Sequence, residues 1–556
     1  MRFRSIGTIF IFFAVFAVVA AFAQEKPADS LRVTGEMVAC AESLIGLQFT
    51  PIEIDSMLEY LDDDLEFIDS LRTVAVPNDV PPALDFNPVP AGMKFDFEQR
   101  PIVLSPPEKT KRPRRLKDLA WYSVRDLGEL VRTRQVTSIE LTRLCIDRLK
   151  KYGPMLHCVI TLTEDLAYRQ AQQADSEIAA GHYRGPLHGI PYGAKDLLAV
   201  QGYPTTWGTG PYKDQVIDMD AKVIQKLEGA GAVLVAKLSM GELAWGDVWF
   251  EDTTRNPWNI SKGSSGSSAG SASAVSAGLV PFAIGTETWG SIVSPSTVCG
   301  ITGLRPTYGR VSRRGAMALS WSMDKIGPLC RTVEDCAIVF DAIRGADGQD
   351  RTTVDIPFNY SPEIDLGKIR VGYLKNDFEA DTTFKKQNEA ALKKLKDLGV
   401  ELVEIELPRL PINSLQIILL AESAAAFDEL TRSGRDDLMT RQVKDAWPNV
   451  FRVSRFIPAV EYIQANRVRT LLIQEMARLF EKIDLYVAPS FEGDNLLLNN
   501  LTGHPCIVLP TGMTREHDWA SITFIGRLYD EGTVLAFAKK YQEATGFHKE
   551  HPPLFK

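Results

Sequence analysis

The sequence predicts an α/β protein in which a mixed or parallel β-sheet is buried between layers of helices. Helical and strand patterns alternate over most of its length, which is typical of this class. The composition, with 45% hydrophobic and 24% charged residues, is that of a globular protein. With 556 residues, the chain is also long enough to bury a large core.

The first 23 residues have the pattern of a secretory signal peptide. Arg2 and Arg4 precede an apolar run over residues 9–21, and Ala21-Phe22-Ala23 is a small-x-small cleavage site. The apolar run is shorter than the ~20 residues of a spanning helix, although an uncleaved anchor is the alternative. We therefore expect cleavage near Ala23, a mature protein that is periplasmic or secreted, and no stable membrane insertion after cleavage.

An amphipathic helix is predicted soon after this segment. Thr50 and Glu53 form a capping box, with Pro51 at the first helical position. Apolar residues then recur every three or four positions as far as Leu71. This seam could pack on the chain's own body or on a second subunit, which leaves a homo-oligomer open. We expect the acidic residues 62–64 beside the seam to form a solvated face.

A proline-rich segment separates this helix from the rest of the chain. Nine prolines occur between residues 77 and 113, which is typical of an extended strap laid over a body. We expect residues 24–115 to form a helical arm and this strap, and residues 116–556 to form the main domain.

Helix and strand patterns alternate through the main domain. Thr137 and Glu140 form a second capping box at the start of an apolar helix. A helix from about Asp220 leads into an apolar strand. The further elements that the pattern predicts are strands over residues 232–238, 368–374 and 400–407 and a helix over residues 387–398.

Charge and cysteine content argue against several classes of protein. The net charge of −9 argues against nucleic acid as a partner, because phosphate binding needs a surplus of Lys and Arg. The basic run over residues 109–117 contains no aromatic residue and is interrupted by Pro113, so we interpret it as a solvated linker. Seven cysteines without CxxC pairs predict no zinc site and fix no disulfide pairing. We expect neither a metal nor another cofactor.

Three segments of the main domain carry residues suited to chemistry. GIPYGAKDL (residues 189–197) places Lys195 among small and apolar residues, where desolvation lowers the pKa of an amine and makes it a neutral base. SKGSSGSSAGSASAVSAG (residues 261–278) runs directly into an apolar stretch, which predicts a loop opening onto a packed helix and strand. GTETWGS (residues 285–291) ends on Ser291 in a turn of small residues, where backbone N–H groups could hold an oxyanion.

Each segment also has an ordinary interpretation when taken alone. Lys195 could be a surface lysine at a strand end, the Gly/Ser segment could be a flexible linker, and Ser291 could be an ordinary turn residue. A phosphate-binding loop is not indicated, because Gly-x-x-x-x-Gly-Lys-Ser/Thr is missing. No histidine stands in a recognisable Ser-His triad motif.

Taken together and in this order, the three segments resemble the amidase signature family. The resemblance covers about residue 118 to the end, and includes GAVLVAKLSMGELAWG (residues 231–246) and SMDKIGPLCRTVEDCA (residues 322–337). It implies the amidase-signature fold, in which helices sandwich a mixed central β-sheet. It also implies hydrolysis of a carboxylic amide to an acid and an amine or ammonia.

Carried over position by position, the resemblance implies a Ser-cisSer-Lys triad. Lys195 matches the family's base, Ser267 the bridging serine that follows a cis peptide bond, and Ser291 the nucleophile. The resemblance further implies an oxyanion hole formed by the N–H groups of Thr288, Trp289, Gly290 and Ser291.

The sequence departs from the family's usual pattern at two places. Glu287 stands where the family usually has Asp, and Trp289-Gly290 stands where it usually has two glycines. Only the backbone N–H of Trp289 is needed in an oxyanion hole, so its ring could wall the acyl pocket. The alternative is that Trp289 marks a degenerate site.

We therefore expect an exported amidase that acts on a small-molecule amide. One alternative is the A-type component of glutamyl-tRNA(Gln) amidotransferase, a glutamine amidotransferase that belongs to the same family as the stand-alone bacterial amidases. The export signal, the acidic balance and the short connection over residues 489–503 argue against it. The other alternative, a non-catalytic exported solute-binding protein, would share the signal and the α/β alternation but would need no reactive serine.

Overall fold

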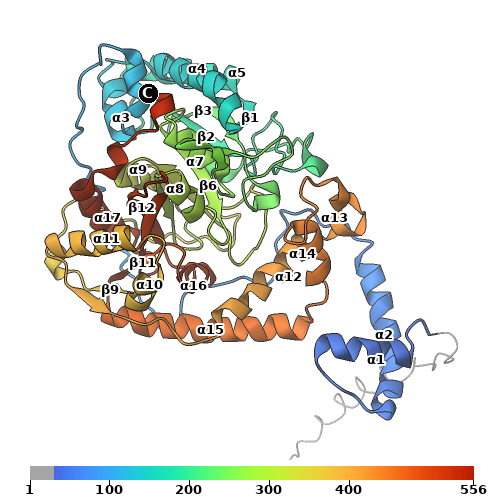
Figure 1. Ribbon diagram of the computed structural model, residues 1–556. Helices are drawn as coiled ribbons and strands as arrows, with labels where there is room; N and C mark the ends of the chain where they lie inside the picture. Colours follow the sequence, from blue (N-terminus) through green and yellow to red (C-terminus); the bar gives the residue numbers. More distant parts are fainter. Residues whose placement is uncertain (1–30) are drawn as a thin grey trace, which may run out of the picture. The chain divides into compact units, whose positions relative to one another are not determined.

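The computed structural model describes residues 31–556, which divide into two compact units (Figure 1). The first unit ends at Pro77, and the second runs from Asn78 to Lys556. The expected signal peptide, residues 1–23, lies outside the described residues. Within residues 31–556, no helix combines the length and the apolar character that a membrane crossing requires.

The described part of the first unit is a pair of helices, α1 (Gly35–Ile45) and α2 (Pro51–Leu71). The predicted capping box of α2 is confirmed: the Glu53 N–H donates to Thr50 Oγ1 at 3.4 Å, and the Thr50 N–H donates to Glu53 Oε2 at 2.7 Å. The expectation of a solvated acidic face is wrong at Asp62. Its side chain is buried and accepts a hydrogen bond from the backbone N–H of Arg32 at 2.7 Å.

The second unit begins with the strap, residues 78–115, which contains neither helix nor strand. It follows the body in an extended path. The Val103 N–H donates to the carbonyl of Tyr360 at 2.9 Å, and the Ser105 N–H donates to Glu334 at 2.9 Å. The apolar strap residues Val89, Met93 and Phe95 pack on a small cluster formed by Ile356, Leu528 and Tyr529.

An 11-stranded mixed sheet forms the core of the second unit, in the order β1-β3-β2-β6-β8-β7-β12-β13-β11-β9-β10. Its strands are β1 (Val159–Leu162), β2 (Pro191–Lys195), β3 (Val233–Leu238), β6 (Phe282–Glu287), β7 (Thr302–Arg305), β8 (Lys325–Cys330), β9 (Val371–Tyr373), β10 (Leu402–Glu404), β11 (Leu485–Pro489), β12 (Cys506–Met513) and β13 (Trp519–Gly526). Neighbours are parallel in β3-β2-β6 and in β11-β9-β10 and antiparallel elsewhere. A separate two-stranded sheet joins β4 (Arg255–Asn256) and β5 (Asn259–Gly263). The predicted mixed sheet is confirmed.

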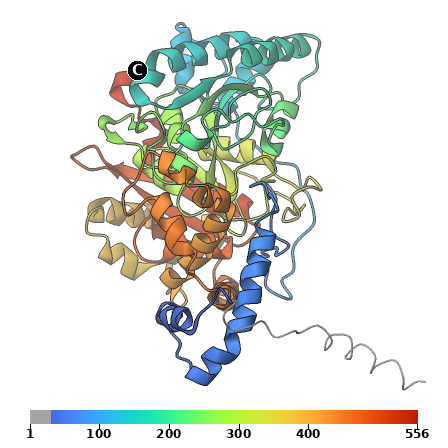
Figure 2. The same cartoon turned by 90° about the vertical axis from the view of Figure 1, so that its right-hand side faces the viewer.

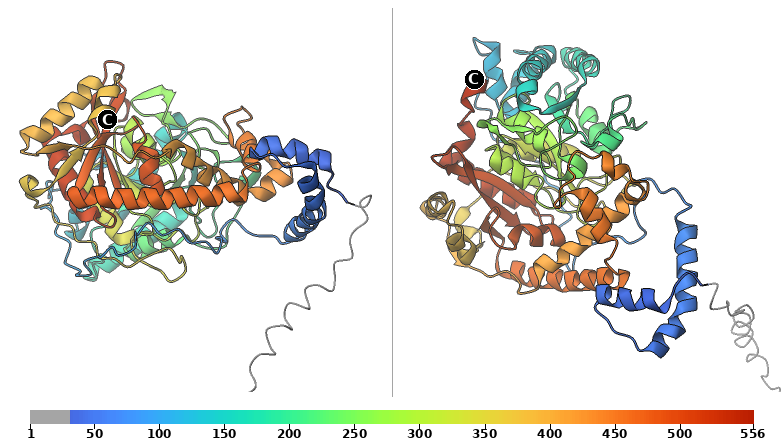
Figure 3. Two further views of the ribbon diagram at one scale, coloured as in Figure 1. Left: turned by 90° about the horizontal axis from the view of Figure 1, so that it is seen from below. Right: turned by 45° about the vertical axis from the view of Figure 1, so that its right-hand side comes forward.

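Helices cover both faces of this sheet (Figures 1 and 2). They are α3 (Val124–Arg132), α4 (Ser138–Leu156), α5 (Glu164–Ala179), α6 (Lys222–Gly229), α7 (Ala269–Ser276), α8 (Val293–Val298), α9 (Val333–Ile343), α10 (Lys375–Ala380), α11 (Lys385–Asp397), α12 (Ile417–Ala426), α13 (Asp428–Arg432), α14 (Trp447–Ser454), α15 (Ala459–Lys482), α16 (Asn495–Thr502) and α17 (Glu531–Thr545). Helices α4 and α5 lie at one end of the body, and the long α15 lies at the opposite end (Figures 1 and 3).

The predicted elements of the main domain are found close to their expected positions. The capping box of Thr137 and Glu140 begins α4, and α6, β3 and α11 coincide with predicted segments. Strands β9 and β10 are shorter than predicted, with three residues each. Strand β10 is the edge of the sheet and pairs only with β9, and Val403 within it is 48% exposed, so the flanking residues gain little from a strand conformation.

Arg148 of α4 connects distant parts of the body. Its buried guanidinium donates to the carbonyl oxygens of Ala277, Gly278 and Phe555, each at 2.8 Å. Two of these acceptors follow α7 directly, and the third lies at the C-terminus, which is next to α3 and α4 in Figure 1.

We expect Arg148→Ala to lower the free energy of unfolding by about 2–4 kcal/mol, because three bonds from a charged donor are lost and buried carbonyls lose their partners. Denaturant titration measures this. Arg143→Ala on the exposed face of the same helix is the matched control and is expected to stay within ~0.5 kcal/mol of the wild type. Equal stability of the two variants would contradict the role given to Arg148.

Candidate active site

Three side chains from three segments form a buried hydrogen-bonded chain. Lys195, the last residue of β2, donates from Nζ to Ser267 Oγ at 2.8 Å, and Ser267 Oγ donates to Ser291 Oγ at 2.9 Å. The peptide bond between Gly266 and Ser267 is cis, as the resemblance implies. The exposed fractions of the lysine and the two serines are 0%, 1% and 7%.

The sheet explains why these residues meet. Strands β2 and β6 are parallel neighbours, so their carboxyl ends lie at the same edge of the sheet. Lys195 ends β2, and the turn with Ser291 follows β6. Ser267 belongs to the Gly/Ser segment, which forms a loop before α7, as predicted. The Ser268 N–H donates to the carbonyl of Ser291 at 3.2 Å and joins this loop to the turn.

The Lys195 amine has polar neighbours but no acidic partner. It also donates to Thr286 Oγ1 at 2.8 Å and to Ser268 Oγ at 3.2 Å, and no ion pair found within residues 31–556 includes it. Burial lowers the pKa of the Lys195 ammonium to about 7, although Asp324 and Glu287 act in the opposite direction. A substantial fraction of the amine is therefore neutral at neutral pH.

Glu287, one of the two departures from the family pattern, fixes the start of α8. Its fully buried carboxylate accepts the N–H groups of Ile292 and Val293 at 2.8 and 2.9 Å. It also accepts from Arg305 at 2.8 Å and from Asn500 at 2.9 Å. Burial favours the neutral acid, but Arg305 and the other donors outweigh it and keep the pKa of Glu287 below its usual value. An ionised carboxylate thus anchors the turn that follows β6.

The turn over residues 288–291 leaves its N–H groups free. Within residues 31–556, none of these four groups has a hydrogen-bond acceptor. Gly290 has a φ of 90°, and a Cβ there would lie 3.1 Å from Ser294 Oγ and 3.2 Å from Leu496. Trp289 is 40% exposed and is not among the residues lining the cavity described next. Ser291 does not line this cavity either, so the expectation that the Trp289 ring walls the acyl pocket stays a prediction.

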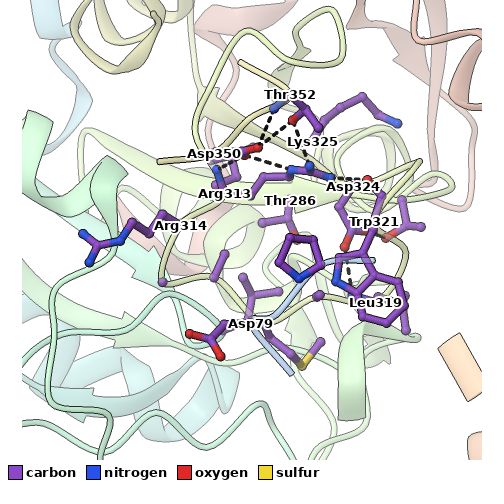
Figure 4. Close-up of a pocket in the computed structure, with 18 of the residues that line it drawn as sticks. Asp79, Thr286, Arg313, Arg314, Leu319, Trp321, Asp324, Lys325, Asp350 and Thr352 are labelled. Carbon is purple, nitrogen blue, oxygen red and sulfur yellow. Dashed lines mark hydrogen bonds and ion pairs between the residues drawn. The ribbon is translucent and has the colours of Figure 1, made fainter. Parts of the chain in front are cut away.

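A cavity of about 220 Å³ lies next to Thr286, whose hydroxyl accepts a hydrogen bond from Lys195 (Figure 4). Thr286 and Thr288 line it, and Thr288 Oγ1 donates to Asp324 at 2.6 Å. Its apolar lining comes from Leu197, Ala244, Met317, Leu319, Trp321 and Ile326. The Arg313–Asp350 ion pair, at 3.2 Å, also borders it. The arrangement offers a nucleophile, a base and free N–H donors next to a small pocket.

Sequence reasoning missed several residues of this site. Thr286 and Ser268, which contact the Lys195 amine, lie within the motifs but had no distinguishing pattern. Asp324 and Asn500 approach from distant segments. Among residues 31–556, no group of three or more His, Cys, Asp and Glu side chains is suitably placed to hold a metal ion.

Comparison with known proteins agrees with the resemblance found in the motifs. The model of the Amidase family matches residues 140–526. The A-type component of glutamyl-tRNA(Gln) amidotransferase from Roseiflexus sp. (strain RS-1) is 34% identical over 483 residues, which cover 78% of this chain and 99% of that protein.

Solved structures show the same similarity. The peptide amidase from Stenotrophomonas maltophilia has a TM-score of 0.69 and 28% identity, and the match covers 77% of this chain and 98% of that one. The A-type component of glutamyl-tRNA(Gln) amidotransferase from Thermotoga maritima has a TM-score of 0.65 and 25% identity, with coverage of 78% and 96%. These matches do not support the solute-binding alternative. The chain belongs to the Amidase family, and it is a hydrolase that acts on carbon–nitrogen amide bonds.

Proposed function

We propose that this protein is an exported amidase that hydrolyses a small carboxylic amide through an acyl-enzyme on Ser291. Lys195 acts as the base, and Ser267 relays the proton between them. The observation that carries the proposal is the buried chain from Lys195 Nζ through Ser267 Oγ to Ser291 Oγ, with links of 2.8 and 2.9 Å. Serine needs an adjacent base to become a nucleophile, and this chain supplies one.

Acylation begins when Ser291 Oγ attacks the amide carbonyl carbon. The Ser291 proton passes to Ser267 Oγ as the Ser267 proton passes to the neutral amine of Lys195, since a hydroxyl both donates and accepts. The carbonyl oxygen becomes an oxyanion, which the free N–H groups of residues 288–291 stabilise. The nitrogen then leaves with the relayed proton, and the acyl group remains on Ser291.

Deacylation uses the same groups in the same order. Water attacks the acyl carbonyl and gives its proton through Ser267 to Lys195. The tetrahedral species collapses, Ser291 Oγ leaves and regains a proton through the relay, and the carboxylic acid is released. No cofactor enters either half of this reaction.

Export is supported by the first 23 residues alone, with their basic start, apolar run and small-x-small site. The test is N-terminal sequencing of the protein recovered outside the cytoplasm. A mature chain that begins near Gln24 supports export, whereas an intact Met1 in a cytoplasmic fraction contradicts it.

A second candidate function is that of the A-type component of glutamyl-tRNA(Gln) amidotransferase. It is favoured by the 34% identity over 99% of one such protein. A cytoplasmic location, together with hydrolysis of glutamine in preference to all other amides, would support this candidate. An extracytoplasmic location would exclude it, because an enzyme that acts on glutamyl-tRNA serves translation, which takes place in the cytoplasm.

We expect Ser291→Ala and Lys195→Ala each to lower kcat/KM for amide hydrolysis by at least ~10³-fold, because residues that act as a unit lose their joint effect when one is removed. Ser276→Ala is the matched control. This variant removes another buried hydroxyl, which donates to the backbone carbonyl of Cys299 at 2.7 Å. It should retain most of the wild-type activity. Near-normal turnover by either alanine variant of the proposed triad would refute the mechanism.

We expect Glu287→Gln to destabilise the protein by about 3–5 kcal/mol, because Arg305 would remain buried without its ionised partner. Glu287→Asp, which keeps the charge, is the matched comparison, and its free energy of unfolding should fall by less. Denaturant titration of both variants measures the difference. If Glu287→Gln were as stable as the wild type, the carboxylate would not be the anchor described above.

A further inference from the structure

We infer that residues 78–86 of the strap form a fixed wall of the substrate cavity and restrict this enzyme to amides of low molecular weight. The inference rests on the proposed function, since it takes the cavity lined by Thr286 and Thr288 as the space that receives the amide. Four observations carry it: the residues that line the cavity, the anchors of the strap, the size of the space, and the position of the strap outside the family match.

The strap contributes directly to the cavity lining. Asp79, Pro81 and Asp85 line the same 220 Å³ space as Thr286 of β6, which contacts Lys195, and Thr288 of the turn that ends at Ser291. In the view of Figure 4, Thr286 lies between the Arg313–Asp350 network and Asp79. The strap therefore shares this cavity with two residues from the segment that leads to Ser291.

One end of this segment is anchored by the side chain of Asn78. Its Nδ2 donates to the carbonyl of Ala318 at 2.9 Å, and its Oδ1 accepts the N–H of Ala318 at 2.7 Å. Nδ2 also donates to the carbonyl of Ala426 at 3.2 Å. Because Ala318 itself lines the cavity, the anchor sits at the cavity rim.

The other end is anchored by Phe86. Its ring lies 3.5 Å from the guanidinium carbon of Arg469 and 5.0 Å from the ring of Tyr308, at 74° to it. Arg469 is 1% exposed and donates to Leu501 and Ser322, so this clamp is rigid. An exposed ion pair between Asp85 and Arg351, at 3.1 Å, adds little energy to these anchors.

The space under the strap is small. A cavity of about 220 Å³ lies below the ~300–1,000 Å³ typical of sites for drug-sized ligands. A second cavity of about 340 Å³ lies next to it, and Asp85 and Trp321 line both. Pro82, Leu84 and Phe86 also line the second cavity. The strap thus lies between the two cavities, and a longer substrate would have to occupy both of them.

The strap also lies outside the region that matches the family, which begins at residue 140. Ser291 and most of the cavity lining lie within the matched region, whereas Asp79, Pro81 and Asp85 of the strap do not. Substrate size is therefore controlled by a part of the chain separate from the catalytic motifs. An amide with a short apolar group fits the lining, while an amide within a folded protein or a long acyl chain does not.

The test compares the mature wild-type protein with the double variant Asn78→Ala/Phe86→Ala, which releases both anchors. The substrates are primary amides with straight acyl chains of two to twelve carbons and acetamides with N-alkyl groups of the same lengths. Gln99→Ala is the matched control, since Gln99 anchors the strap to Phe358 and Asn359 away from the cavity. Labelling of Ser291 by alkyl fluorophosphonates of graded length is the second readout.

We expect wild-type kcat/KM to fall steeply with length in at least one series. The double variant should raise the ratio of long-chain to short-chain kcat/KM by ~10-fold or more, and Gln99→Ala should leave it within twofold. If the double variant does not fold, Asn78→Ala alone should change the ratio in the same direction.

Two outcomes overturn the inference. One is an equal long-chain to short-chain ratio in the double variant and in Gln99→Ala, and the other is equal wild-type rates on long and short amides. Absence of any Ser291 adduct and of any hydrolysis by the wild type overturns the proposed function as well.

Discussion

Burial of the Lys195 amine without an acidic partner is the constraint on which the site depends. The neighbouring strand offers a comparison. Lys237 of β3 is just as buried, but it is paired with Asp196 at 2.8 Å, so its charge is compensated. Lys195 has only hydroxyl and carbonyl oxygens within reach. Such neighbours accept hydrogen bonds from a neutral amine but do not compensate an ammonium charge. Burial lowers the pKa of both lysines, but of the two it is Lys237 that has a carboxylate at ion-pair distance to favour its charged form, which suits Lys195 to the base role proposed above.

The sheet and a second buried carboxylate hold the partners of this amine in place. Parallel pairing of β2 with β6 brings Lys195 and the Ser291 turn to one edge. Glu287 ends β6 and binds the first N–H groups of α8, Asn500 of α16 and Arg305 of β7. The turn before Ser291 is thus held by two helices and a strand that meet at the Glu287 carboxylate. The Glu287 side chain is longer than the Asp that the family usually has at this position. Ser291 Oγ nevertheless lies 2.9 Å from Ser267 Oγ.

Much of the fold and of this site could be predicted from the sequence. Capping boxes at Thr50 and Thr137 located two helices, because the residues of each box lie three positions apart. The resemblance of three segments to one family located Lys195, Ser267 and Ser291. Contacts between distant segments could not be predicted. Nothing near Asp62 signals that its side chain is buried and accepts a hydrogen bond from Arg32, and nothing near Asn78 signals its pairing with Ala318, 240 residues away. Such contacts depend on packing, which periodicity does not encode.

The pH dependence of Ser291 acylation by a fluorophosphonate tests the ionisation of Lys195 most directly. Burial lowers the pKa of Lys195 to about 7, and only the neutral amine accepts a proton. The acylation rate should therefore be low below this pH, rise through it and level off above it. In Lys195→Ala, the rate should be low and should show no such rise. A rising limb near pH 10, the ordinary range of lysine, would contradict the account, as would a wild-type rate that stays constant from pH 5 to 9.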